Sequence, residues 1–320
     1  MSDARVHRMV SEVTVAAPAG VLYGLIADAT RWPLFFQPCV HVEQLDFDGS
    51  RERLRMWATA GGTIASWVSR RELDVGRRRV TFHQDLTEAP VESMSGVWTV
   101  RPLGDRCRVV LEHTFTVIGD VPADVAWVER VTRANSRAQL DRLAQLAACW
   151  TRLDELVLSF EDTVRFKGPA EVVFDFLYRA EDWPGRLPHV RALDLVEDTA
   201  GVQVMAMDSL GADGGAHRTE SVRICFPAAG RLVYKQTLTS PLLAAHTGEW
   251  SLTPDERGVT LTARHDVLLR EDAAATVAGA AGGQAGLAAA GRHVRDELGR
   301  DCLLVLQHAV RHAAGAVRVL

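Results

Sequence analysis

The sequence lacks three features, and each absence excludes a class of protein. No run of about 18 apolar residues occurs, so a membrane-spanning helix is not expected, and residues 1–10 contain no apolar stretch of signal-peptide length. The five cysteines are scattered without CxxC spacing, which argues against a disulfide framework and against a thiolate metal cluster. We therefore expect a cytoplasmic protein with reduced cysteines and no bound metal.

Lysine and aromatic residues are scarce, and the net charge is slightly negative. All but two of the basic residues are arginine, aromatic residues make up 7% of the chain and the formal net charge is -5. Proteins that bind nucleic acid carry basic patches, often interleaved with aromatic residues, so a nucleic-acid ligand is not expected. With 320 residues, of which 47% are hydrophobic, the chain has enough apolar material for one large or two ordinary domains.

The first half of the chain contains an ordered series of predicted elements. Alternating residues predict a strand over 6–15, Pro18 opens a helix at its first turn, and a second short helix follows over 32–36. Segments of strand length then follow, separated by turn residues, over 40–46, 51–58, 63–73, 78–84, 91–101 and 107–117. They predict an antiparallel meander, and a long helix from Pro122 to about Leu153 comes after it.

The second half repeats this order. Trp183-Pro184 lies 151 positions after Trp32-Pro33, and His265 lies 152 positions after His113. A change of one residue in the offset is what loop variation produces. We therefore predict a duplication, with one domain at residues 1–152 and a second at residues 153–320.

One segment of the second half has no clear assignment. Residues 273–290 are nearly all alanine and glycine, which fits a helix extension, a close-packed segment or a loop. The terminal helix itself is predicted over residues 292–311.

Polar residues share one face of the predicted strand Ala65–Leu73. Because side chains alternate along a strand, Trp67, Ser69 and Arg71 lie on the same face. The matching face of the second copy carries His217, Thr219, Ser221 and Arg223. An inward arginine keeps its charge, so it needs an acid, a wet cavity or an anionic ligand. Arg71 has no acid on its own face of the strand, and we therefore expect a water-accessible cavity.

The last strand of each copy carries one histidine within an apolar stripe. His113 lies between Leu111 and Phe115 on its strand face, and His265 occupies the matching place. A lone histidine on such a face is more often a satisfied core residue than a functional group. The inward arginines favour the functional interpretation, and the other inward residues fit the wall of a small-molecule site. These are Phe82, Gln84, Met94 and Trp98 in the first copy and Tyr234, Gln236, His246 and Trp250 in the second. For the two tryptophans, core packing is the alternative.

Three motifs give the chain a resemblance to a known superfamily. They are Trp32-Pro33, Trp67-Val68-Ser69-x-Arg71 and Gly96-x-Trp98, and they stand in the order of strand, two helices, meander and long helix. In these features the chain resembles the helix-grip fold of the START and Bet v 1 superfamily and, more narrowly, the aromatase/cyclases of bacterial type II polyketide synthases. The resemblance implies an α+β fold of tandem helix-grip domains, each a curved antiparallel sheet of about seven strands wrapped around a long C-terminal helix with two short helices.

The resemblance also implies an activity and partners. Two tandem copies resemble the di-domain members of the family. This implies first-ring aldol cyclisation, commonly between C7 and C12, with dehydration and aromatisation of a ketoreduced, carrier-bound poly-β-ketone. The implied partners are an acyl carrier protein that bears the chain, a minimal polyketide synthase and a ketoreductase. No cofactor, nucleic acid or membrane is implied.

The resemblance carries over to individual residues. The family's pocket arginine, strand tryptophan and serine correspond to Arg71, Trp67 and Ser69, and its last-strand histidine corresponds to His113. The polar position of the terminal helix corresponds to Asn135 and, in the second copy, to Asp301. A buried guanidinium can stabilise an enolate oxygen, and a histidine that titrates near neutrality can act as acid or base. The residues assigned to catalysis are therefore Arg71, His113, Arg223 and His265. Those assigned to substrate binding are Trp67, Ser69, Phe82, Gln84, Met94, Trp98, Asn135, His217, Ser221, Tyr234, Gln236, His246, Trp250 and Asp301.

Two departures from the family's pattern leave alternatives open. Pro38 stands where some single-domain relatives have a tyrosine, and Thr219 stands in the second copy in place of Trp67, so the sequence does not say whether both pockets catalyse. The same fold also serves as a passive carrier of apolar ligands, which needs the cavity but not the histidines. A scaffold with one inert domain is a third possibility.

Overall fold

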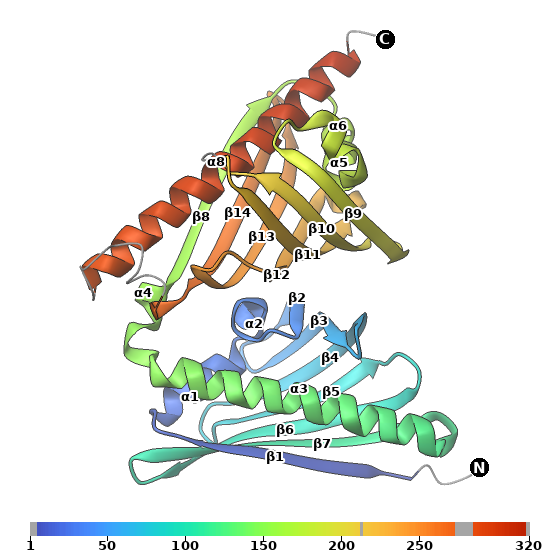
Figure 1. The fold of residues 1–320 in the computed structure, drawn as a ribbon. Helices are drawn as coiled ribbons and strands as arrows, with labels where there is room; N and C mark the ends of the chain where they lie inside the picture. Colours follow the sequence, from blue (N-terminus) through green and yellow to red (C-terminus); the bar gives the residue numbers. More distant parts are fainter. Residues whose placement is uncertain (1–4, 212–213, 273–283, 318–320) are drawn as a thin grey trace. The chain divides into compact units, whose positions relative to one another are not determined.

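The chain divides into two compact units, Met1–Leu153 and Asp154–Leu320. The computed structural model describes residues 5–211, 214–272 and 284–317. Each unit contains one seven-stranded antiparallel sheet and one long helix (Figure 1). The predicted fold class, a tandem pair of helix-grip domains, is therefore confirmed.

The first unit follows the predicted order of elements. Its strands are β1 (His7–Val15), β2 (Cys39–Phe47), β3 (Arg51–Ala60), β4 (Thr63–Asp74), β5 (Arg79–Leu86), β6 (Val91–Leu103) and β7 (Arg106–Val117). Its helical segments are α1 (Ala19–Ala27), η1 (Ala29–Arg31), α2 (Trp32–Phe35), η2 (Ile118–Asp120), α3 (Pro122–Ala148) and η3 (Trp150–Arg152), and α4 (Leu153–Leu156) spans the boundary. The long helix α3 ends at Ala148, earlier than predicted, and the short helical segments η3 and α4 follow it.

The second unit repeats the order. Its strands are β8 (Val157–Phe166), β9 (Val190–Thr199), β10 (Val202–Leu210), β11 (Ala216–Phe226), β12 (Arg231–Leu238), β13 (Leu243–Asp255) and β14 (Gly258–Leu269). Its helical segments are α5 (Ala170–Tyr178), η4 (Ala180–Asp182), α6 (Trp183–Arg186), η5 (Pro227–Ala229) and α8 (Gln284–Val317). Helix α8 includes residues 284–290 of the Ala/Gly-rich segment, while residues 273–283 lie outside the described part of the chain.

The two sheets have the same topology. The strand order is β1-β7-β6-β5-β4-β3-β2 in the first unit and β8-β14-β13-β12-β11-β10-β9 in the second. Strands β2 to β7 form the predicted meander, and β1 pairs with β7, the last strand of that meander. Each sheet curves around the long helix of its own unit (Figure 1).

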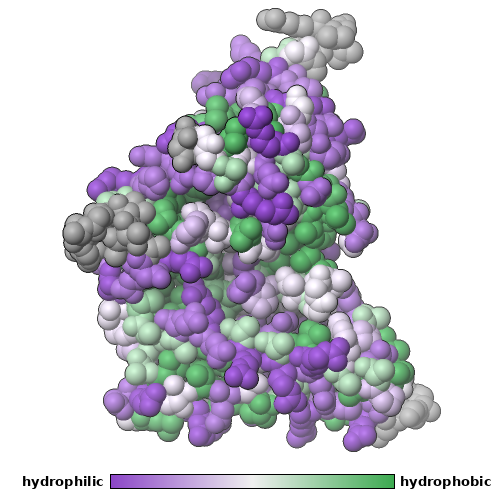
Figure 2. All heavy atoms as spheres, viewed as in Figure 1, coloured by the Kyte–Doolittle hydropathy of each residue, from purple (hydrophilic) through white to green (hydrophobic). Residues whose placement is uncertain are grey.

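The inner faces of the sheets are largely apolar, as the alternation of the strands predicts. Val109, Leu111 and Phe115 of β7 are almost inaccessible to solvent, whereas Arg108 and Glu112 on the opposite face of the strand are exposed. Hydrophilic residues are spread over the visible surface of both units (Figure 2).

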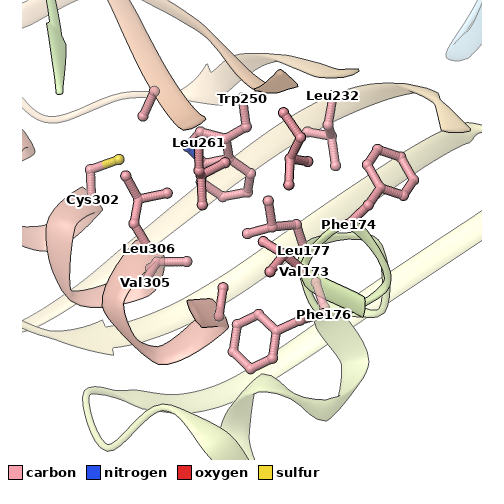
Figure 3. Close-up of a cluster of buried hydrophobic side chains, with 14 of the residues drawn as sticks. Val173, Phe174, Phe176, Leu177, Leu232, Trp250, Leu261, Cys302, Val305 and Leu306 are labelled. Atoms are coloured by element: carbon pink, nitrogen blue, oxygen red, sulfur yellow. The ribbon is translucent and has the colours of Figure 1, made fainter. Parts of the chain in front are cut away.

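Helices of the second unit pack against its sheet through apolar side chains. In the second unit, Val173, Phe176 and Leu177 of α5 join Leu306 of α8 in one buried cluster (Figure 3). Fully burying such a side chain contributes about 1.5–3 kcal/mol, so these contacts hold the helices against the sheet. The polar residues that remain inside this framework are therefore held in fixed positions.

Candidate functional site

Each unit contains a cavity between its curved sheet and its long helix. The cavity of the first unit has a volume of about 150 Å³, and that of the second unit has a volume of about 440 Å³. We call them the N-terminal cavity and the C-terminal cavity. Their walls combine aromatic rings with a few polar groups, which is the usual composition of a small-molecule site.

The structure places every candidate residue named from the sequence on one of these two walls. The N-terminal cavity is lined by Trp67, Ser69, Arg71, Phe82, Gln84, Met94, Trp98, His113 and Asn135. The C-terminal cavity is lined by His217, Ser221, Arg223, Tyr234, Gln236, His246, Trp250, His265 and Asp301. Thr219, which stands in the place of Trp67, also lines the C-terminal cavity.

Arg71 of β4 is held by three different groups. Its Nη2 donates to the backbone carbonyls of Ile26 and Ala27, 2.8 and 2.9 Å away, at the C-terminal end of α1. Its Nη1 lies 3.2 Å from the carboxylate of Glu52, and its guanidinium lies 5.0 Å from the ring centroid of Trp32. The C-terminal end of a helix is negatively polarised, and a carboxylate and the face of an aromatic ring also attract a positive charge. All these contacts therefore favour the charged form of Arg71.

Glu52 corrects the expectation that water in a cavity would satisfy Arg71. The acid comes from the neighbouring strand β3, where Glu52 lies directly opposite Arg71 in the register. Only 5% of Glu52 and 4% of Arg71 are exposed, so this is a buried ion pair. Burial lowers the pKa of Arg71 to about 10, Glu52 partly offsets that effect, and the guanidinium stays charged at neutral pH.

Arg223 of β11 has the same helix and aromatic contacts but no such acid. Its Nη2 donates to the carbonyl of Leu177 near the end of α5, and its guanidinium lies 5.6 Å from the ring centroid of Trp183. Opposite it in the register stands the neutral Gln203. Within the described parts of the chain, no carboxylate lies within ion-pair distance of Arg223. Burial lowers its pKa to about 10, so it too stays cationic.

The Trp-Pro pairs of the sequence now have a structural explanation. The indole of Trp32 donates to the carbonyl of Leu25, 3.1 Å away, and the indole of Trp183 donates to the carbonyl of Phe176, 3.0 Å away. Each tryptophan thus packs across the end of the preceding helix and presents its ring to the buried arginine.

The Gly-x-Trp motifs are explained by a close approach of an aromatic ring to the backbone. Gly96 lies opposite Phe82, and a Cβ at Gly96 would come within 2.4 Å of that ring. Gly248 has the same relation to Tyr234, again at 2.4 Å. The two glycines therefore let Phe82 and Tyr234 lie flat across the sheet as part of the cavity wall.

The histidine of the N-terminal cavity stands alone. His113 packs against the edge of Phe82, with ring centroids 5.5 Å apart, and makes no hydrogen bond to any residue in the described part of the chain. Burial lowers its pKa to about 4. The ring is therefore a neutral imidazole at neutral pH.

The histidine of the C-terminal cavity belongs to a cluster. Nδ1 of His265 lies 3.0 Å from Nε2 of His246 and 3.1 Å from the hydroxyl oxygen of Tyr234. Burial lowers the pKa of His265 to about 4, and burial together with the neighbouring His265 lowers that of His246 to about 3. The prediction that the catalytic histidines titrate near neutrality was therefore wrong, because burial in an apolar wall disfavours the imidazolium.

A second polar group on the wall of the C-terminal cavity combines carboxyl and imidazole side chains. Asp301 and Glu297 come from α8, His217 from β11, and His189 from the segment after α6. Burial, and after it the charge of Glu297, raises the pKa of Asp301. His189 stands 151 positions after Pro38, the position of the family's tyrosine, so the second copy has a titratable side chain where the first has none.

Three residues that shape the sites were not singled out from the sequence. Glu52 and Gln203 lie opposite the two arginines, and Glu197 accepts a 2.7 Å hydrogen bond from Gln203. A signal for Glu52 existed, because it alternates with the buried Leu54 and Met56 on β3. Its pairing with Arg71 depends on strand register, which the alternation does not give.

The described residues show neither a metal centre nor a membrane span. No group of three or more His, Cys, Asp or Glu side chains among them has the arrangement of a metal site. No helix within the described ranges is long and apolar enough to cross a membrane.

Comparison with known proteins finds relatives along the whole chain. Residues 15–144 match the family described as polyketide cyclase / dehydrase and lipid transport. The chain is 44% identical to the granaticin polyketide synthase bifunctional cyclase/dehydratase of Streptomyces violaceoruber, over 97% of this chain and 95% of that protein. It is 39% identical to the actinorhodin polyketide synthase bifunctional cyclase/dehydratase of Streptomyces coelicolor, over 99% of this chain and 100% of that protein.

Two solved structures share the architecture of both units. The di-domain ARO/CYC BexL from the BE-7585A biosynthetic pathway is 41% identical, with a TM-score of 0.83 over 96% of this chain and 98% of that chain. The di-domain ARO/CYC StfQ from the steffimycin biosynthetic pathway is 30% identical, with a TM-score of 0.81 over 97% of this chain and 99% of that chain.

Proposed function

Because this chain belongs to the family of polyketide synthase bifunctional cyclase/dehydratases, we propose that it closes the first ring of a ketoreduced, carrier-bound poly-β-ketone by an aldol reaction between C7 and C12. Loss of water then makes that ring aromatic. The chain is thus a cyclase/dehydratase.

One observation carries the assignment of residues. Each cavity combines a buried cation with a neutral imidazole, and aromatic rings line the space between sheet and helix. An aldol reaction needs a base for a carbon acid, a positive charge near the enolate oxygen, and a chain held in one conformation. These are the functions that the two cavities can supply.

Arg71 and Arg223 are proposed to stabilise the enolate oxygen. A fixed donor in an enclosed site can contribute on the order of 3 kcal/mol when charge develops beside it. Glu52 already neutralises much of the charge of Arg71, whereas Arg223 faces the neutral Gln203. We therefore assign the stronger oxyanion stabilisation to the C-terminal cavity, whose larger volume also leaves more room for the substrate chain.

His113 and His265 are proposed to take the proton from the carbon between two carbonyls. Their lowered pKa values of about 4 keep both rings unprotonated at neutral pH, so each is ready to accept a proton. A methylene between two carbonyls is already acidic, so a weak base in direct contact is sufficient. The other residues of the walls, among them Trp98 and Trp250, would hold the chain bent for one ring closure.

Domain roles and partners follow from the same proposal. We assign aromatase/cyclase machinery to both predicted domains, residues 1–152 and 153–320. The substrate would arrive on an acyl carrier protein in the cytoplasm, after a minimal polyketide synthase and a ketoreductase have acted. The names of the relatives, which are polyketide synthase components, support these partners.

Reconstitution tests the proposal. The protein is added to a minimal type II synthase, its carrier protein and a ketoreductase, and the products are identified by mass spectrometry and NMR. Wild type is expected to yield the C7–C12 aromatic ring. Arg223→Met and His265→Gln are expected to leave mostly uncyclised or non-aromatic product, while Arg257→Met, at an exposed turn, serves as the matched control. If the wild-type protein leaves the product mixture unchanged, the proposal is wrong.

A further inference from the structure

The C-terminal cavity contains two histidines that share a hydrogen bond and leave two nitrogen atoms free. Nε2 of His246 and Nδ1 of His265 lie 3.0 Å apart. The other nitrogens, Nδ1 of His246 and Nε2 of His265, are buried and have no hydrogen-bond partner among the described residues. Both side chains line the cavity, and only 2% of His246 and 3% of His265 are exposed. A buried polar atom without a partner is costly, so each of these two atoms needs a partner that the described residues do not supply.

Two neutral imidazoles linked in this way form one unit with two possible proton arrangements. In one arrangement Nδ1–H of His265 donates to His246, which leaves Nε2 of His265 as a base and Nδ1–H of His246 as an acid. In the other arrangement His246 donates, and the acid and the base change places. A proton taken up at one free nitrogen therefore releases a proton from the other, and the pair never becomes charged.

We propose that His246 and His265 act together as a proton relay for the loss of water from a β-hydroxy ketone in the C-terminal cavity. One free nitrogen takes the proton from the carbon next to the carbonyl, and the electron pair of that C–H bond forms the new C=C bond. The shared proton crosses between the rings, and the other free nitrogen gives its proton to the hydroxyl group. The C–O bond then breaks and water leaves. This inference rests on the proposed function, because it assigns the dehydration step of that reaction.

The surroundings of His265 hold its ring in one plane. Phe160 of β8 stacks on it, with ring centroids 4.8 Å apart. The guanidinium of Arg295, a residue of α8, lies 4.4 Å from the centroid of the Phe160 ring. Arg295 is fixed in turn by two hydrogen bonds to Asp162, of 2.7 and 3.0 Å. A Cβ at Gly299 would lie 2.1 Å from a terminal nitrogen of Arg295, so a larger residue there would make this side chain shift. These contacts position the ring before any substrate binds.

The N-terminal cavity lacks every part of this unit except one imidazole. Met94 stands in the place of His246, Phe82 in the place of Tyr234, and Met9 is the register partner of His113 where Phe160 is that of His265. A single imidazole can take up a proton, but it has no second ring through which another proton could be given to the hydroxyl group of the substrate. The relay is therefore a property of the C-terminal cavity alone.

The test uses the full-length protein and a synthetic monocyclic β-hydroxy ketone carried as a pantetheine thioester. His246→Gln keeps a hydrogen-bonding group near Nδ1 of His265 but cannot pass a proton through itself. We expect kcat for dehydration to fall by on the order of a hundredfold, with KM little changed. Tyr234→Phe, which removes the other group that contacts Nδ1 of His265, is expected to lower kcat far less. The reverse order of the two effects would overturn the relay.

Solvent isotope effects provide a readout that a merely structural role would not change. In mixtures of H2O and D2O, a relay that moves several protons in one step gives a curved dependence of rate on deuterium fraction. His246→Gln should make that dependence linear. A linear dependence in the wild type would contradict the relay even if the variant is slow.

A measurement that needs no bound substrate tests the relay separately from the proposed function. In protein labelled with 15N-histidine, the relay requires both rings to be neutral at pH 7 and to share one proton, as two-bond 1H–15N correlations report. A cationic ring, or the absence of the shared proton, would rule out the relay. If wild type does not convert the probe, the proposed function fails on that substrate, and the spectra still decide whether the relay exists.

Discussion

The two cavities are built from the same elements but differ in what surrounds the buried arginine. In both units the guanidinium lies over a tryptophan and donates to carbonyls at the C-terminal end of the first helix, so this part of the motif joins the sheet to that helix in both copies. The difference lies in one residue of the neighbouring strand, Glu52 in the first unit and Gln203 in the second. A duplicated motif can thus keep its structural role while its electrostatic environment changes.

The same comparison extends to the bases. The N-terminal cavity has one isolated imidazole and about 150 Å³ of space, whereas the C-terminal cavity has a linked pair of imidazoles and about 440 Å³. The second unit therefore combines an unpaired cation, more room and a richer set of proton-transfer groups. Three sets of variants test this contrast.

The largest expected effect comes from removing the two arginines. Arg71→Met leaves the buried carboxylate of Glu52 without its partner, which is expected to reduce the free energy of unfolding by about 3–5 kcal/mol. Arg223→Met leaves only a backbone carbonyl unsatisfied, for an expected loss of about 1–3 kcal/mol. Urea unfolding of the full-length variants, followed by circular dichroism and tryptophan fluorescence, measures both losses.

A double variant tests the cause of this difference. Arg71→Met combined with Glu52→Gln removes the unpaired charge and gives the first unit the glutamine that the second unit has. It should regain most of the extra stability that Arg71→Met alone loses. Equal losses for the two single variants would show that Glu52 is not the source of the contrast.

A smaller effect is expected at the two glycines of the Gly-x-Trp motifs. A Cβ at Gly96 would lie 2.2 Å from the backbone oxygen of Glu112, which cannot move without disturbing the sheet, so Gly96→Ala should cost about 3 kcal/mol. At Gly248 the obstructing atoms belong to the end of the Tyr234 side chain, so Gly248→Ala should cost about 1–2 kcal/mol. Thermal unfolding of both variants measures the contrast, and a larger loss at Gly248 would contradict it.

The sequence predicts the fold well because the signals it uses are local or repeated. Alternation places Arg71 and His113 on inward faces, and matched Trp-Pro pairs reveal the duplication, without any knowledge of strand pairing. What decides the chemistry is not local. That Glu52 faces Arg71 depends on the register of β3 against β4, and that His246 touches His265 depends on a diagonal contact between β13 and β14. The lowered pKa values depend on burial, which a strand pattern does not quantify.

The smallest effect concerns acid stability, and its sign follows from the buried histidines. An imidazole whose pKa is lowered by folding stays unprotonated while the unfolded chain, with an ordinary pKa near 6.5, takes up the proton. The unfolded state then binds more protons, so stability falls as the pH drops from about 6.5 toward the folded-state pKa of about 3 for His246. Three histidines of this kind, His189, His246 and His265, lie in the C-terminal cavity and one, His113, lies in the N-terminal cavity, so the second unit should be the more sensitive to acid.

His246→Met, which copies Met94 of the first cavity, isolates one of these contributions. Between pH 7.5 and pH 5.5 the variant should lose about 1.4 kcal/mol less stability than the wild type, because a group with a pKa near 6.5 is largely protonated in the unfolded chain at pH 5.5. Subtracting the change in the variant from the change in the wild type cancels the opposing effect of Asp301, whose raised pKa acts in the other direction. Urea unfolding at both pH values gives the difference, and His83→Met provides the same substitution at an exposed position. If His246→Met and the wild type lost equal stability on acidification, the imidazole of His246 would have to take up a proton in the folded protein. The contrast between the buried His246–His265 pair and the single His113 of the N-terminal cavity would then no longer hold.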